Sequence, residues 1–193
     1  MINVLLKAPI LSKSGYGEHA RFVYRSLKQR PDIFDVFVVA TEWGQSSWLL
    51  NETNEVNQIN LDITRTSKFI SDNPHNSVEK PIFDISLQVT IPNEFEISAR
   101  SNIGITAGIE TDRVSAEWIQ KANTMQGLIV VSKHAKEGFN KTSYDATRGE
   151  GGEKFLLKTT VPIDVVGYPT KTFEEKNLTD LGITTKFNFL TIC

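Results

Sequence analysis

The sequence has almost no cysteine and no marked excess of charge of either sign. Cys193 is the only cysteine among 193 residues, which excludes an internal disulfide and a metal cluster built from cysteines. The formal net charge is -2, so the chain lacks the basic excess of a nucleic-acid-binding protein and we expect no nucleic-acid partner. A chain without internal disulfides fits a reducing cytoplasm, which is the location we expect.

Long apolar runs are also missing. No run approaches the roughly 20 residues needed to cross a bilayer, so we expect no transmembrane segment. The apolar run from Ile2 to Leu11 is interrupted by Lys7 and Pro9. It lacks a basic flank and a small-residue cleavage site, which predicts a core strand rather than a signal peptide. With 39% hydrophobic and 23% charged residues, the chain is typical of a soluble globular protein.

Strand and helix patterns alternate along the chain and predict an α/β fold. We expect strands at Ile2–Ala8, Phe34–Ala40, Phe83–Val89, Asn102–Thr106, Gly127–Val131 and Val161–Val166. Helices are expected at Tyr16–Arg30, Leu61–Ser71, Val114–Thr124 with Ser115 as N-cap, and from Ser132 to about Lys141. This order predicts a Rossmann-like parallel sheet with helices on both faces. Residues 140–160 have the composition of a flexible, exposed loop.

The domain boundaries follow from the same patterns. Residues 1–170 are expected to form one Rossmann-like domain, and residues 171–186 a linker with a short helix. Residues 187–193, FNFLTIC, form a strand pattern. This strand can begin a second domain, or it can join the sheet as its last member. An exposed strand at this position can also mediate self-association.

A glycine-rich segment follows the first predicted strand. Residues 15–20, GYGEHA, match G-x-G-x-x-A, and the glycines permit close approach of a ligand to a helix start that attracts anions. Glu42, near the end of the second strand, stands where a dinucleotide fold places its ribose-binding acid. However, six residues, Pro9 to Ser14, separate the strand from the first glycine, whereas the dinucleotide fingerprint places that glycine directly after the strand. A helix entry that binds nothing is the plainer alternative; the position at the end of a parallel strand favours ligand contact.

A second polar loop, Glu110-Thr111-Asp112-Arg113, follows the strand at Asn102–Thr106. Parallel sheets bind ligands at the carboxyl ends of their strands, so the carboxylates of Glu110 and Asp112 can accept hydrogen bonds from hydroxyl groups of a ligand. Acidic residues just before a helix are equally typical of a structural role, because negative charge at a helix N-terminus interacts favourably with the helix dipole. Arg113 can contact a phosphate or form a surface ion pair.

Other single residues have two interpretations each. Ser132 and Lys133 can bind an anion, or serve as an N-cap and a solvated lysine. Trp43 and Trp48 can stack on a ligand ring, whereas Trp118 is expected in the core. His19 and His134 have no visible partner ligands, so we expect no metal site.

Several segments together resemble a known family. The segments are Ser14-Gly15-Tyr16-Gly17 with the helix after it, Glu110-Thr111-Asp112, Val130-Val131-Ser132-Lys133-His134, residues 161–169 (VPIDVVGYP) and residues 187–192 (FNFLTI). In this order they resemble the N-terminal domain of GT-B retaining glycosyltransferases of glycosyltransferase family 4. The resemblance implies two Rossmann-like domains across a cleft. The N-terminal domain holds the acceptor, and the C-terminal domain binds the sugar nucleotide with an E-x7-E motif.

The resemblance also implies a set of site residues and partners. The substrate-binding residues would be Ser14, Gly15, Tyr16, Gly17, Thr90, Glu110, Thr111, Asp112, Arg113, Ser132 and Lys133. The partner would be a sugar or glycan acceptor, and the donor of the full-length enzyme would be a nucleotide sugar, with no other cofactor. Thr90-Ile91-Pro92 and Thr106-Ala107-Gly108 stand where many members carry a histidine, so catalytic residues remain unassigned. Because the donor domain would be present only as its first strand, we expect this chain alone to be inactive as a hexosyltransferase.

Two other functions stay open at this point. The chain can be an NAD(P)-type or other nucleotide-binding Rossmann enzyme, or a non-catalytic binding module that uses the same cleft.

Overall fold

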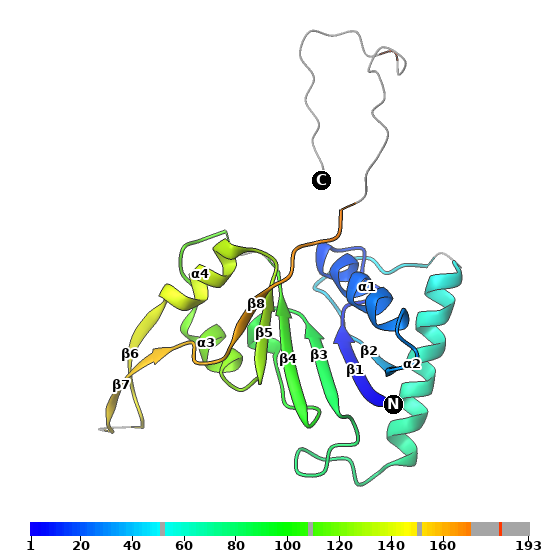
Figure 1. Cartoon of the computed structure of the whole chain (residues 1–193), viewed down its shortest axis with the longest axis horizontal. Helices are drawn as coiled ribbons and strands as arrows, with labels where there is room; N and C mark the ends of the chain where they lie inside the picture. Colours follow the sequence, from blue (N-terminus) through cyan, green and yellow to red (C-terminus); the bar gives the residue numbers. More distant parts are fainter. Residues whose placement is uncertain (51–52, 108–109, 150–151, 171–181, 183–193) are drawn as a thin grey trace.

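The fold of the chain is a six-stranded, wholly parallel sheet with helices packed around it (Figure 1). We analysed a computed structural model, which describes residues 1–50, 53–107, 110–149 and 152–170, and Gly182. The sheet contains β1 (Ile2–Ala8), β2 (Phe34–Ala40), β3 (Ile85–Val89), β4 (Ser101–Thr106), β5 (Gly127–Val130) and β8 (Ile163–Val165). The helices are α1 (Gly15–Lys28), α2 (Asn54–Asp72), α3 (Ala116–Ala122), α4 (Lys133–Lys141) and the 3-10 turn η1 (Pro92–Glu94). The predicted Rossmann-like α/β fold is therefore confirmed.

The strand order is β2-β1-β3-β4-β5-β8, which places β1 between β2 and β3. Val4 of β1 pairs with Val36 on one side and with Ile85 on the other. The chain therefore builds β2 on one side of β1 and then returns to build β3 on the other side. In open α/β sheets, ligands bind at the carboxyl ends of the strands where the order reverses in this way. The end of β1 is that point here.

The two faces of the sheet bury different helices. On one face, Val4, Leu6 and Ala8 of β1 pack with Ala20 and Tyr24 of α1. On the other face, Leu128 and Val130 of β5 pack with Ile119 of α3 and Phe139 of α4. Successive side chains of a strand point to opposite faces, so the continuous apolar runs of these strands supply both cores.

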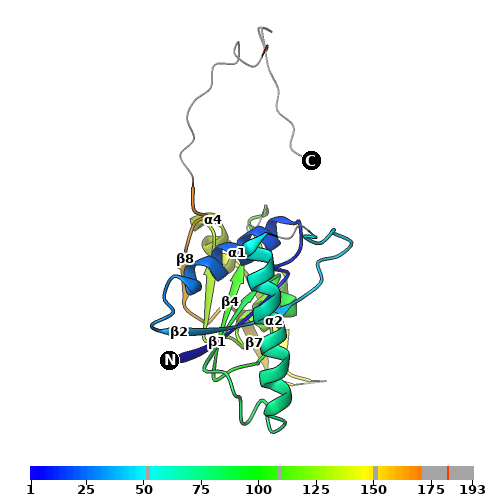
Figure 2. The same cartoon turned by 90° about the vertical axis from the view of Figure 1, so that its right-hand side faces the viewer.

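Helix α2 packs across the edge strand β2 (Figures 1 and 2). The Thr66 hydroxyl accepts a hydrogen bond from the backbone N–H of Val38 at 2.7 Å, and Arg65 donates to the carbonyl of Val36. Side chains of α2 thus bind backbone groups of β2 that no neighbouring strand pairs. The helix is longer than the predicted Leu61–Ser71 because the Thr53 side chain caps it about two turns earlier, ahead of a mostly polar stretch.

The prediction of a flexible loop at residues 140–160 was wrong. Residues Ser143–Thr147 (β6) and Lys154–Lys158 (β7) form an antiparallel hairpin that projects at the end of the molecule opposite α2 (Figure 1). Tyr144 and Leu157 face each other in the ladder and pack against the α3–α4 core. Gly149, which follows β6, has a φ of +66°, a conformation that favours glycine.

Residues 171–186, except Gly182, and residues 187–193 lie outside the described residues, and so do the predictions of a linker and of a further strand there. Among the helices of the described ranges, none combines the length and the apolar character that a membrane span requires.

Candidate functional site

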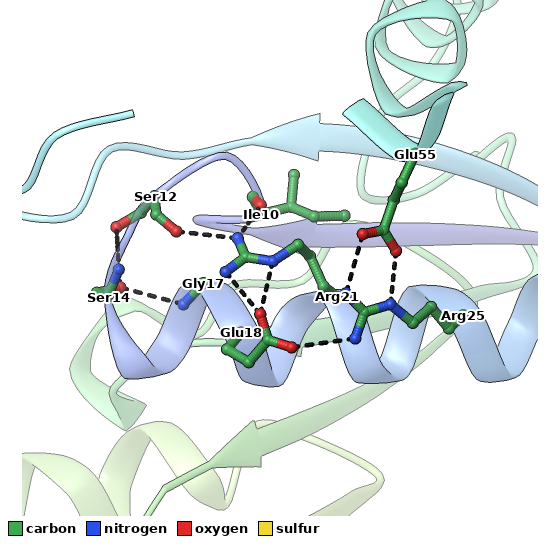
Figure 3. A network of polar contacts seen from close by, with 8 residues as sticks. All are labelled: Ile10, Ser12, Ser14, Gly17, Glu18, Arg21, Arg25 and Glu55. Carbon is green, nitrogen blue, oxygen red and sulfur yellow. Dashed lines mark hydrogen bonds and ion pairs between the residues drawn. The ribbon is translucent and has the colours of Figure 1, made fainter. Parts of the chain in front are cut away.

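The loop between β1 and α1 is held by the buried side chain of Arg21 (Figure 3). The Arg21 guanidinium donates to the carbonyl oxygens of Ile10 at 2.7 Å and Ser12 at 2.9 Å. It also pairs with the carboxylate of Glu18 at 2.8 Å, and Glu18 receives a second bond from Arg25. Partial burial acts to raise the pKa of Glu18, but the hydrogen bonds from Arg25 and Arg21 outweigh it and hold the pKa below its usual value. The side chain of Arg21 therefore fixes the position of the predicted loop after β1.

The two glycines of the predicted motif have different roles. The N–H of Gly17 donates to the N-cap side chain of Ser14 at 3.1 Å (Figure 3). A Cβ at position 17 would lie 2.1 Å from the carbonyl oxygen of Ser12, so only glycine fits between the helix and the loop. A Cβ at Gly15 would meet nothing within 4 Å. Gly17 thus serves packing and Ser14 serves capping, whereas Gly15 is exposed at the start of α1.

Tyr16 connects three loops at the carboxyl edge of the sheet. Its hydroxyl lies 3.0 Å from Oγ1 of Thr106 and accepts a bond from the N–H of Ala107 at 3.1 Å. Its ring packs against Trp43, with 4.3 Å between ring centroids. The loops after β1, β2 and β4 therefore meet at this side chain. Trp48, the other predicted stacking residue, is 40% exposed, and a β-bridge joins it to Ser12.

A polar pocket of about 260 Å³ lies at the ends of β1, β2 and β3, and is lined by Lys7, Thr41, Glu42, Thr90 and Glu94. The Thr90 hydroxyl hydrogen-bonds the carboxylate of Glu94. The Thr41 hydroxyl is buried and has no hydrogen-bond partner among the described residues. The pocket offers two carboxylates, one ammonium group and two hydroxyls, a set that can bind a neutral ligand rich in hydroxyl groups.

Neither the predicted residues Ser14 to Gly17 nor the second predicted group, Glu110 to Arg113, lines this pocket; of the predicted site residues only Thr90 does. Glu110, Thr111, Asp112 and Arg113 are all exposed. The loop is held to the neighbouring elements: Nε2 of His134 lies 3.1 Å from the carbonyl oxygen of Thr111, and the Arg113 guanidinium lies 5.0 Å from the centroid of the Tyr144 ring.

Ser132 and Lys133 occupy the start of α4. The Ser132 side chain accepts from the N–H of Ala135 at 3.1 Å and is the N-cap of this helix, while Lys133 is exposed. The N-cap role expected for Ser132 is therefore observed, and its anion-binding role stays a prediction.

Sequence reasoning missed Lys7, Thr41 and Glu94 as lining residues of the pocket. A usable signal was the position of Lys7, a charged residue near the end of an otherwise buried strand. Its ammonium group pairs with Glu96 at 2.7 Å. Glu42 was considered only as a ribose-binding acid, and the structure shows that it lines the same pocket as Thr90.

Within the described residues, no group of three or more His, Cys, Asp or Glu side chains is arranged to hold a metal ion. The fold and the polar pocket at its strand-order reversal thus define the candidate site. No protein-family model, no curated protein and no solved structure matches this chain.

Proposed function

We propose that this chain is the acceptor-binding domain of a GT-B glycosyltransferase, which moves a sugar from a nucleotide sugar to a hydroxyl group of an acceptor. The observation that carries the proposal is the pocket lined by Lys7, Thr41, Glu42, Thr90 and Glu94. It lies at the carboxyl edge of a Rossmann-like sheet, next to the reversal of strand order, where such sheets bind their ligands.

The composition of the pocket suits a sugar. Sugar hydroxyls both donate and accept hydrogen bonds, so they can donate to the carboxylates of Glu42 and Glu94 and accept from Lys7. In the transfer reaction the acceptor oxygen bonds to the anomeric carbon, the nucleoside diphosphate leaves, and the acceptor loses its proton. Glu42 and Glu94 are the pocket groups able to receive that proton.

A nucleotide-binding Rossmann enzyme is the second candidate, and the position of Glu42 just after β2 favours it. Two features weigh against it. The loop of Pro9 to Ser14 separates β1 from the first glycine, and the Gly17 N–H is bonded to Ser14 rather than directed at a phosphate.

Saturation-transfer NMR with a panel of neutral monosaccharides and disaccharides tests the proposal, with NAD⁺ and UDP-glucose titrated by calorimetry in parallel. At least one neutral sugar is expected to bind. Thr90→Val and Glu94→Gln should each weaken its binding about tenfold, the effect of losing one well-made hydrogen bond in a closed site.

Glu117→Gln is the matched control, because Glu117 is an exposed carboxylate on α3 outside the pocket. This variant should bind the sugar as tightly as the wild-type protein does. Sugar binding that is unchanged in both Thr90→Val and Glu94→Gln would contradict the proposed site. Tight binding of NAD⁺ with no sugar binding would favour the nucleotide-binding enzyme.

A further inference from the structure

Lys7, Gln88 and Gly104 form one row across three neighbouring strands of the sheet. Lys7 of β1 pairs in register with Gln88 of β3, and Gln88 pairs in register with Gly104 of β4. Residues paired in this way point to the same face, and Lys7 alternates with the β1 residues that pack on α1, so the row lies on the face opposite α1. Residues 94–96 contact all three members of the row.

Gln88 fixes the backbone of residues 94–96. Its side chain is fully buried, and its amide makes two hydrogen bonds to the peptide groups of Glu96. Oε1 of Gln88 accepts from the Glu96 N–H at 3.0 Å, and Nε2 donates to the Glu96 carbonyl oxygen at 2.5 Å. A Cβ at Gly104 would lie 2.4 Å from the ring of Phe95, so the glycine gives this buried ring its place on the sheet. The segment is therefore held against the row at two successive residues.

The carboxylate of Glu96, placed in this way, pairs with the ammonium group of Lys7 at 2.7 Å. Lys7 is the one cation among the described lining residues of the polar pocket, which also include the carboxylates of Glu42 and Glu94. The positive charge of the lining is thus already paired with a carboxylate from outside it, while the lining itself carries two negative charges.

We propose that Gln88 is a positioning residue of the polar pocket: it holds Glu96 on Lys7, and this ion pair makes the pocket select neutral sugars over acidic ones. The inference rests on the proposed function. The carboxylate of an acidic sugar requires a cation, and Glu96 already occupies the ammonium group of Lys7. Glu42 and Glu94 repel a third carboxylate in the same space. A neutral hydroxyl group can still accept from the remaining N–H bonds of Lys7.

The selectivity is tested by competition in saturation-transfer NMR with three pairs of probes: glucose and glucuronate, galactose and galacturonate, and mannose and mannuronate. In the wild-type protein, the neutral member of a pair should bind at least about tenfold tighter than the acid. Glu96→Gln frees the Lys7 ammonium, so this preference should fall about tenfold, chiefly because the acid binds more tightly. Glu96 is exposed, so the variant keeps the fold.

Gln88→Met keeps the length of the side chain but removes both hydrogen bonds to Glu96, and should lower the preference to the same extent. The double variant Gln88→Met/Glu96→Gln should match Glu96→Gln alone, because Gln88 acts only through Glu96. A general loss of packing would instead add to the effect of Glu96→Gln. The matched control is Gln126→Met, since Gln126 also accepts from a backbone N–H, that of Asn102, but does not contact residues 94–96 through this bond. Its preference should equal that of the wild type.

The ammonium group of Lys7 gives a readout that needs no ligand. In ¹⁵N-lysine NMR, its protons should exchange with water more slowly than those of the exposed Lys133, because the bond to Glu96 protects them. This difference should disappear in Gln88→Met and in Glu96→Gln, and should persist in Gln126→Met.

Different results would overturn the two parts of the proposal. Proton exchange at Lys7 that is unchanged in Gln88→Met would overturn the positioning role. A preference for neutral sugars that persists in Glu96→Gln would overturn the selectivity. If no sugar of either kind binds, the proposed function and the selectivity both fail, whereas the exchange at Lys7 still decides the role of Gln88.

Discussion

The hydroxyl of Tyr16 lies 3.0 Å from Oγ1 of Thr106, and so joins the first turn of α1 to the end of β4. The same hydroxyl accepts from the N–H of Ala107, which leads into the second polar loop. One side chain therefore ties the glycine-rich helix start to the carboxyl end of β4.

We expect Tyr16→Phe to lower the free energy of unfolding by about 1–2 kcal/mol, because it leaves the Ala107 N–H and the Thr106 hydroxyl with one partner fewer. Urea unfolding measures this change. A double-mutant cycle with Thr106→Val isolates the coupling between the two hydroxyls. Strictly additive effects of the two changes would show that the contact contributes nothing to stability.

Arg21→Met should be more costly, at about 2–4 kcal/mol, because two loop carbonyls lose charged donors inside the protein. Amide hydrogen exchange should then accelerate in residues 10–14. The control is Arg30→Met, which breaks only the exposed pair with Asp32 and should change stability little. Equal effects of the two substitutions would contradict the structural role of Arg21.

The two glycines of the motif give a matched pair of tests. Gly17→Ala places a methyl group 2.1 Å from the Ser12 carbonyl oxygen and should cost at least about 2 kcal/mol. Gly15→Ala, two residues away in open space, should be neutral or stabilising by up to about 1 kcal/mol. Thermal unfolding of the two variants distinguishes them, and a similar loss in both would mean that the loop is not packed as described.

The buried imidazole of His19 predicts a pH dependence of stability. Burial holds its pKa below the ordinary value near 6.5, so the unfolded chain binds the proton more readily than the folded chain. Stability should therefore be complete above about pH 6.5 and fall as the pH drops below it, by at most about 1.4 kcal/mol per pH unit. Urea unfolding between pH 7 and 5.5 should show a shallower slope for His19→Gln. Parallel slopes would show that His19 does not titrate differently in the folded state.

The fold was predictable from sequence because the strands are buried on both faces. Two of the predicted strands are mostly apolar, with few polar residues: Ile2–Ala8 and Phe34–Ala40. The first and last residues predicted for each strand agree with the structure. The hairpin was missed because β6 and β7 bury little: only Leu157 of its ten strand residues is buried. In an exposed hairpin, apolar and polar residues alternate only weakly along the strands. The glycine-rich composition of residues 148–153 therefore led to the prediction of a loop.

The polar pocket was harder to predict than the fold. Thr90 was expected at the site, but Lys7, Thr41 and Glu94 come from three different segments, and only the strand order brings them together. The sequence around Ser132 fits both a helix N-cap and an anion-binding site. The position of Ser132 in the sequence does not distinguish these two roles, because both use the same residue types.

The placement of α2 along β2 has a consequence for aggregation. An open edge strand can recruit strands of other molecules, and here Thr66 and Arg65 occupy backbone groups of that edge. Any intermediate in which the sheet has formed before α2 docks exposes the apolar strand FDVFVVA with its edge free. Docking of α2 thus limits aggregation during folding as well as in the folded state. Substitutions that weaken the docking of α2 should first lower the yield of soluble protein.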